Sequence, residues 1–208
     1  MPKRGSSQTR NSYGYHDRRV GTLNPIERFL IVCEGEKTEP CYFKKFRVPS
    51  KVKIYTYGTG ENTINVVKKA IELRANDNYD QVWCVFDRDS FPKKDFNNAL
   101  DLAQREKIEV AYSNESFELW YLLHFHYCDT AISRQDCIGK INQYFREHIS
   151  CDYQKNSEKN YELLKTRQET AIRNAEKLLA QYSTPNPADD KPSTTVHRLV
   201  KRLNRSVL

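Results

Sequence analysis

Short apolar runs alternate with amphipathic segments along residues 25–125. Residues 29–33 (FLIVC) and 82–86 (VWCVF) are unbroken apolar runs, typical of strands buried on both faces of a parallel sheet. Two further strands are predicted at 52–57 and 108–112, and helices at 39–47, 62–74, 95–106 and 116–125. Thr38 is the expected cap of the first helix. Strands alternating with helices of this length predict an α/β domain whose parallel sheet is covered on both faces.

The remainder of the chain has a different pattern on each side of this domain. Apolar residues at helical spacing predict helices around 138–145, 163–182 and 194–203, with an irregular linker at 184–192. Residues 126–208 are therefore expected to form a helical extension packed on the α/β domain. Residues 1–24 are basic and poor in apolar side chains, which predicts a disordered arm.

Charge favours an acidic partner. Lys and Arg number 34 against 27 Asp and Glu, which gives a net charge of +7 and a pI near 9.0. Nucleic acid is the expected partner. The cations of the arm are candidate phosphate contacts, although a solvated tail is an equally good interpretation: Lys3, Arg4, Arg10, Arg18 and Arg19.

Hydropathy and cysteine spacing do not indicate a membrane-spanning, exported or zinc-binding protein. No stretch approaches the roughly 18 to 20 apolar residues that span a bilayer, and the first ten residues lead into no apolar signal region. No membrane partner is expected, and the predicted location is cytoplasmic. The six cysteines are scattered and form no CxxC motif, so they are interpreted as reduced thiols rather than zinc ligands.

Acidic residues follow two of the predicted strands directly. Glu34 and Glu36 come after the first strand, and Asp87 and Asp89 come after the third. Ligands of open α/β sheets bind beyond the carboxyl ends of the strands. Two carboxylates separated by one residue on an extended segment point the same way and repel each other unless a cation lies between them. We therefore expect Asp87 and Asp89 to hold Mg²⁺, or Mn²⁺, with Glu34 as an acid, a base or a further ligand.

Several nearby residues are secondary candidates. Glu36 and Glu118 could reach the same site, although a structural contact is as good an interpretation of Glu118. Lys37 could bind phosphate or be solvated. His124 and His126 cannot share one helical face, which favours ordinary interface histidines over a metal pair.

Four segments together resemble one protein family. They are IVCEGEKTEPCYF (31–43), VWCVFDRDSF (82–91), NESFELWYLLHF (114–125) and NPADDKPSTTVHRLV (186–200). The chain resembles RloB proteins, and its strand-end Glu-Gly and Asp-x-Asp motifs are similar to those of the Toprim superfamily. The resemblance implies a Toprim-like fold in which Glu34 matches the catalytic glutamate and Asp87 and Asp89 match the metal-binding pair. In one departure, this chain has Asn114-Glu115 where the family pattern has Asn-Pro.

The resemblance also implies a biological role. RloB genes are associated with restriction and abortive-infection loci, commonly beside an ATPase of the AAA or ABC type. The implied function is a metal-dependent nuclease, a phosphodiesterase acting on DNA or RNA, in anti-phage defence with an ATPase partner.

Two other functions stay open from the sequence. One is a non-catalytic Toprim module that scaffolds a nucleic-acid or ATPase defence complex. The other is a phosphatase of the haloacid-dehalogenase type with Asp87 as nucleophile. Ser90-Phe91 is an atypical continuation for such a phosphatase, and that interpretation leaves Glu34 unexplained.

Overall fold

The computed structural model describes residues 27–46, 52–56, 63–89 and 92–205. The predicted basic arm, 1–24, lies outside the described residues. A five-stranded sheet forms the centre of the fold, in the order β2-β1-β3-β4-β5. Its strands are β1 (Phe29–Cys33), β2 (Val52–Thr56), β3 (Gln81–Asp87), β4 (Glu109–Asn114) and β5 (Ser193–Thr194). The first four are parallel and β5 is antiparallel to β4, which confirms the predicted α/β class.

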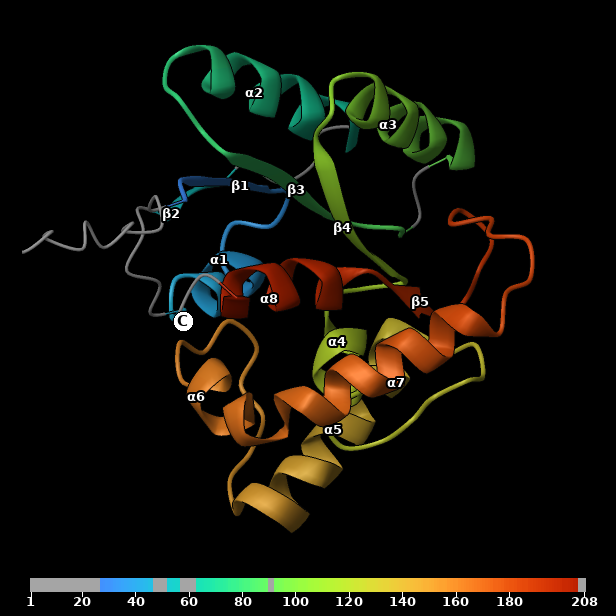
Figure 1. The fold of residues 1–208 in the computed structure, drawn as a ribbon. Helices are drawn as coiled ribbons and strands as arrows, with labels where there is room; N and C mark the ends of the chain where they lie inside the picture. The colour runs from blue at the N-terminus through green and yellow to red at the C-terminus, as the bar shows by residue number, and fades with distance from the viewer. Residues whose placement is uncertain (1–26, 47–51, 57–62, 90–91, 206–208) are drawn as a thin grey trace, which may run out of the picture.

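Helices cover both faces of the sheet (Figure 1). One face carries α2 (Thr63–Ala75) and α3 (Lys93–Arg105). The other carries α1 (Thr38–Phe43) and α8 (Val196–Arg205), with the remaining helices beyond them. These are α4 (Glu118–Leu122), α5 (Arg134–Ile149), α6 (Asn160–Leu164), the 3-10 helix η1 (Lys165–Arg167) and α7 (Gln168–Ala180).

The apolar pattern of β1 explains its central place. All five of its residues are fully buried. Successive side chains of a strand point to opposite faces, so Leu30 packs with the α2 and α3 side while Ile31 packs with the opposite core. An unbroken apolar run is therefore required here, since polar side chains on either face would be buried without partners.

The strand order sets the position of the site. After β1 the chain forms β2 on one side of it and then returns to form β3 on the other side. The topological switch point of the sheet thus lies between the carboxyl ends of β1 and β3, where α/β sheets bind their ligands. The acidic residues that the sequence singled out follow these two ends.

Several predicted elements differ from the observed ones. Thr38 does not cap α1 but is its first residue, and its hydroxyl bonds to Asn156 instead. The helix expected at 39–47 ends at Phe43, and the helix expected at 116–125 is only the five-residue α4. The long helix expected at 163–182 is divided into α6, η1 and α7.

The C-terminal region is integrated with the sheet. The two-residue strand β5 was not predicted, because it is too short to show a hydrophobic period. Its Thr194 pairs with Ser113 of β4, and the next residue, Thr195, bonds to Tyr112. Residues on both sides of the predicted boundary at 125 share one apolar cluster, which includes Trp120, Phe145 and Leu199. Among the described residues, no helix has the length and apolar content needed to cross a bilayer.

Candidate functional site

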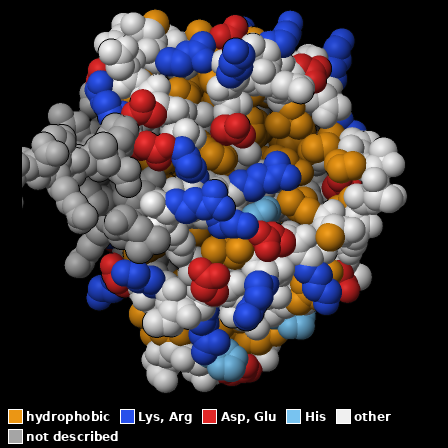
Figure 2. All heavy atoms as spheres, in the orientation of Figure 1, with side chains coloured by type: hydrophobic (Ala, Val, Ile, Leu, Met, Phe, Trp, Pro, Cys, Tyr) orange, Lys and Arg blue, Asp and Glu red, His pale blue; other side chains and the backbone are white. Residues whose placement is uncertain are grey.

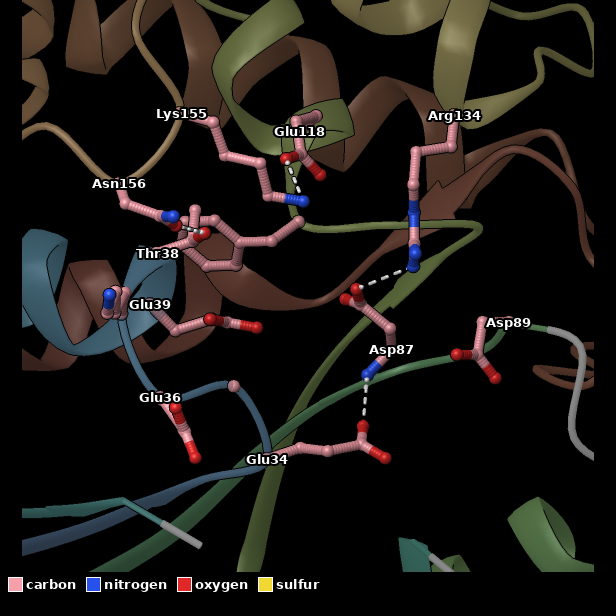
Figure 3. Close-up of a pocket in the computed structure, with 13 residues that line it drawn as sticks. Glu34, Glu36, Thr38, Glu39, Asp87, Asp89, Glu118, Arg134, Lys155 and Asn156 are labelled. Atoms are coloured by element: carbon pink, nitrogen blue, oxygen red, sulfur yellow. Dashed lines mark hydrogen bonds and ion pairs between the residues drawn. The ribbon is translucent and has the colours of Figure 1, made fainter. Parts of the chain in front are cut away.

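A cavity of about 430 Å³ lies at the carboxyl ends of β1 and β3. Its wall contains six acidic side chains and three basic ones: Glu34, Glu36, Glu39, Asp87, Asp89 and Glu118, with Lys37, Arg134 and Lys155. Figure 3 shows the acids of the strand ends on one side of the cavity, with Glu118, Arg134 and Lys155 reaching toward them from the other side. The structure therefore brings together all six residues that the sequence singled out for this site: Glu34, Glu36, Lys37, Asp87, Asp89 and Glu118.

Glu34 and Asp87 are linked directly. The backbone N–H of Asp87 donates a 3.1 Å hydrogen bond to Oε2 of Glu34. The backbone N–H of Glu34 in turn donates to the carbonyl of Val85 at 2.9 Å, which continues the pairing of β1 with β3. The parallel register of the two strands thus fixes the glutamate beside the Asp-x-Asp segment.

The glycine of the Glu34-Gly35-Glu36 turn has a packing role. A Cβ at Gly35 would overlap the carboxylate of Glu39. Glu39 lies in the first turn of α1 and is 6% exposed, and its side chain lines the cavity. A larger residue at position 35 would therefore displace the Glu39 carboxylate from its observed position in the cavity wall.

Arg134 enters the site because α5 begins there. Ser133 caps the helix, and its hydroxyl oxygen accepts a 3.1 Å bond from the backbone N–H of Asp136 and donates to the Asp136 carboxylate at 2.6 Å. This start presents Arg134 to the cavity, where its guanidinium lies 3.3 Å from Oδ2 of Asp87. Its Nε is buried and has no hydrogen-bond acceptor in the described part of the chain.

Lys155 comes from the loop between α5 and α6. Two contacts hold this loop over α1: the Thr38 hydroxyl bonds to Asn156 Oδ1 at 2.5 Å, and Lys45 pairs with Glu158 at 2.7 Å. Asn156 has a φ of 67°, a left-handed conformation that asparagine adopts more readily than most residues. Lys155 Nζ consequently lies 3.2 Å from Oε1 of Glu118, which is almost fully buried.

Burial and mutual repulsion raise the pKa of three acids of the cavity, Glu34, Asp87 and Glu39. Burial, with smaller effects from Asp89 and Glu39, raises the pKa of Glu34 to about 7, and the bond from the Asp87 amide opposes the rise. The pKa of Asp87 is raised by burial and then by the charges of Glu39 and Glu118, while Arg134 lowers it. Burial and Glu118 also raise the pKa of Glu39. The site would hold its carboxylates as anions more readily with a cation present.

The donor chemistry suits a hydrated hard cation. Within the described residues, no three Asp, Glu, His or Cys side chains converge closely enough to hold a metal ion together. Mg²⁺ needs only one or two carboxylates and keeps several waters, so Asp87 and Asp89 are a sufficient donor set. The crowded anions fit such an ion, whereas the neutral and sulfur ligands of a structural zinc site do not occur in the cavity.

The remaining candidates take different positions. Glu36 and Lys37 are exposed at the rim. His124 is buried, its Nδ1 lies 2.9 Å from the carbonyl of Trp120, and its pKa is lowered by burial to about 4. Neither His124 nor His126 lines the cavity. Glu115, which stands where the family pattern has proline, pairs with Lys191 at 2.5 Å and leaves the cavity untouched.

The sequence did not predict three charged residues of the cavity wall: Glu39, Arg134 and Lys155. Glu39 could have been found, because a third acid after Glu34 and Glu36 falls in the first turn of the predicted helix. Ser133-x-x-Asp136 is a capping signature that marks the start of α5 and hence Arg134. Nothing in the local sequence singles out Lys155.

Comparison with known families gives one match. The family model of RloB, described as RloB-like protein, matches residues 29–203. Searches of curated proteins and of solved structures each found no match.

Proposed function

The chain belongs to the RloB-like protein family, and we propose that it is a metal-dependent nuclease that hydrolyses phosphodiester bonds at the acidic cavity. One observation carries the proposal. Glu34 and Asp87 come from neighbouring parallel strands, meet through a 3.1 Å hydrogen bond at the switch point of the sheet, and face two cationic side chains. The Glu-Gly and Asp-x-Asp motifs at these strand ends resemble those of Toprim enzymes.

The acids have separate roles in this proposal. Asp87 and Asp89 would hold Mg²⁺ or Mn²⁺, which when bound supplies charge stabilisation to the phosphoryl group. Glu34, with a pKa near neutrality, holds or releases a proton at its free carboxylate oxygen during the displacement. Its other oxygen accepts from the Asp87 amide, which fixes the direction of the side chain.

The basic residues complete the site by binding phosphate. Arg134 has a buried Nε without an acceptor among the described residues, and a guanidinium suits the oxygens of a phosphodiester. Lys155 is about half exposed and extends from a loop, so its ammonium can follow a substrate at the rim of the cavity. Both residues lie after position 125, so the helical region supplies phosphate contacts to a centre built on the sheet.

The family resemblance suggests a substrate, a partner and a biological role. Nucleic acid is the proposed substrate, and an ATPase of the AAA or ABC type encoded nearby is the proposed partner. The proposed role is anti-phage defence.

The competing function is a non-catalytic module that scaffolds such a complex. The ion pair between Arg134 and Asp87 favours it, since an aspartate neutralised by arginine does not require a metal. The raised pKa of Asp87 weighs against it, because the arginine does not offset the burial and the neighbouring acids.

Purified protein, with and without its genomic ATPase neighbour, tests the proposal. It is incubated with plasmid, single-stranded DNA and total RNA in Mg²⁺, Mn²⁺ or EDTA. We expect cleavage of at least one substrate with a divalent cation and none in EDTA. No cleavage of any substrate, with the partner present, would support the scaffold instead.

A further inference from the structure

A second cavity lies at the opposite end of the sheet, beside α8. It has a volume of about 500 Å³ and is lined by the first residues of β3 and β4, by Glu176 of α7 and by one side of α8. Its distance from the acidic cavity follows from β3, which runs from Gln81 at this cavity to Asp87 at the other. Six residues of strand correspond to about 20 Å.

Arginines line the α8 side of this cavity. Arg198, Arg202 and Arg205 recur at spacings of four and three residues, which places them along one face of the helix. Seven residues of helix extend about 10 Å, so the three guanidinium groups form a short row. Figure 2 shows Lys and Arg side chains gathered over α8.

Two of the four cations in this lining are not neutralised locally. Lys201 pairs with Glu176 at 2.6 Å, and Arg202 pairs with Glu27. The guanidinium groups of Arg198 and Arg205 form no salt bridge with the parts of the chain that the structure describes. Neighbouring cations in such a row repel one another, and a bound anion would relieve this repulsion.

Two buried nitrogen atoms belong to residues that line the same cavity. Trp83 and His197 are each 5% exposed, and the indole Nε1 of Trp83 and the Nδ1 of His197 have no hydrogen-bond partner among the described residues. An indole N–H can only donate. Buried polar atoms are rarely left unpaired, so these two nitrogens beside the cavity need partners that the described residues do not supply.

We propose that this second cavity, called the groove below, binds the sugar–phosphate backbone of a nucleic-acid strand, as a contact separate from the acidic cavity. Guanidinium groups bind phosphate oxygens through paired hydrogen bonds, and a row of three suits successive phosphates of one strand. The choice of nucleic acid as occupant rests on the proposed function. The groove holds the substrate at a distance from the bond that is cut, and contributes affinity rather than chemistry.

The test compares two double variants of the full chain. Arg198→Gln with Arg205→Gln removes the two unpaired cations of the groove. Lys68→Gln with Lys94→Gln is the control, because it removes the same charge from exposed positions on α2 and α3, on the other face of the sheet. Binding of a fluorescent single-stranded oligonucleotide is measured by anisotropy against salt in EDTA, so that no cleavage occurs. Melting temperatures verify that both variants are folded.

The groove variant should lose two phosphate contacts. The slope of log K, where K is the association constant, against log salt concentration should be less steep by about 1.4 than in the wild type. Between about 1 M and 0.1 M salt, the affinity of the groove variant should therefore increase by roughly 25-fold less than that of the wild type. The control variant should follow the wild-type line closely. Parallel lines for the groove variant and the wild type would overturn the proposal. Displacement of the oligonucleotide by low concentrations of ATP would also overturn it, by assigning the groove to a free nucleotide.

The outcomes for the groove and for the nuclease proposal are distinguishable. A flatter salt slope with no cleavage activity under any condition would keep the groove and refute the nuclease. Cleavage by the wild type with unchanged salt slopes would keep the nuclease and refute the groove.

Discussion

Replacing Glu34 by Gln should change the pH dependence of stability in a specific way. The glutamine keeps an oxygen that accepts the hydrogen bond from the Asp87 amide, but it carries no charge at any pH. In the wild type, the cavity raises the pKa of Glu34 from 4.5 to about 7. The stability that the neutral carboxyl contributes is fully present below pH 4.5 and is lost as the pH rises to about 7, because the folded state then binds more protons than the unfolded state.

The size of the effect follows from the shift. A rise of about 2.5 pKa units corresponds to about 3 kcal/mol, and partial solvent access to Glu34 reduces this to about 2 kcal/mol. For a chain of this length, 2 kcal/mol is about 4 to 8 °C in Tm. Glu34→Gln should therefore unfold at about the same temperature as the wild type at pH 5 and several degrees higher at pH 8.

Thermal unfolding in EDTA at pH 5, 6, 7 and 8 measures this difference. Asp87 and Glu39 also have raised pKa values and are present in both proteins. Because the charge of Glu34 contributes to the raised pKa of Asp87, the difference between the two curves reports Glu34 together with its effect on Asp87. A difference in Tm that stays constant from pH 5 to pH 8 would refute the assignment of a near-neutral pKa to this carboxyl.

Three further changes test the roles of Arg134, of Gly35 and of residues 1–24. Arg134→Gln should bind Mn²⁺ several-fold more tightly at pH 8, because no guanidinium then competes for Asp87, and it should bind substrate more weakly. Calorimetry measures Mn²⁺ binding and anisotropy measures substrate binding, and weaker Mn²⁺ binding would contradict the competition between Arg134 and the metal. Gly35→Ala should cost about 1 to 3 kcal/mol by displacing the Glu39 carboxylate, and urea unfolding should show that Glu39→Ala in the same chain recovers much of the loss. Deleting residues 1–24 should flatten the salt dependence of nucleic-acid binding and leave the Tm nearly unchanged; parallel salt lines would show that the arm does not contact the nucleic acid.

The sequence predicted the sheet and the acids at its edge, because both depend on local patterns. An apolar run such as 29–33 can only be buried on both faces, and a carboxylate that follows it must lie at the end of the strand. Arg134 and Lys155 could not be predicted in the same way. They reach the cavity only because a capped helix start and a loop tethered to α1 are placed over the sheet by tertiary packing. The strand β5 was also beyond prediction, since two residues show no period.

The metal dependence of cleavage in matched variants tests the central claim most directly. Asp87→Asn removes a proposed metal ligand from the end of β3, while Glu36→Gln removes an equal charge from the exposed rim of the same cavity. Each variant is incubated with the substrate that the wild type cleaves, over a range of Mn²⁺ concentrations, after unfolding curves have verified the fold. We expect Asp87→Asn to lose cleavage at every Mn²⁺ concentration and Glu36→Gln to keep most of it. Wild-type cleavage by Asp87→Asn would contradict the assignment of this cavity as the catalytic centre.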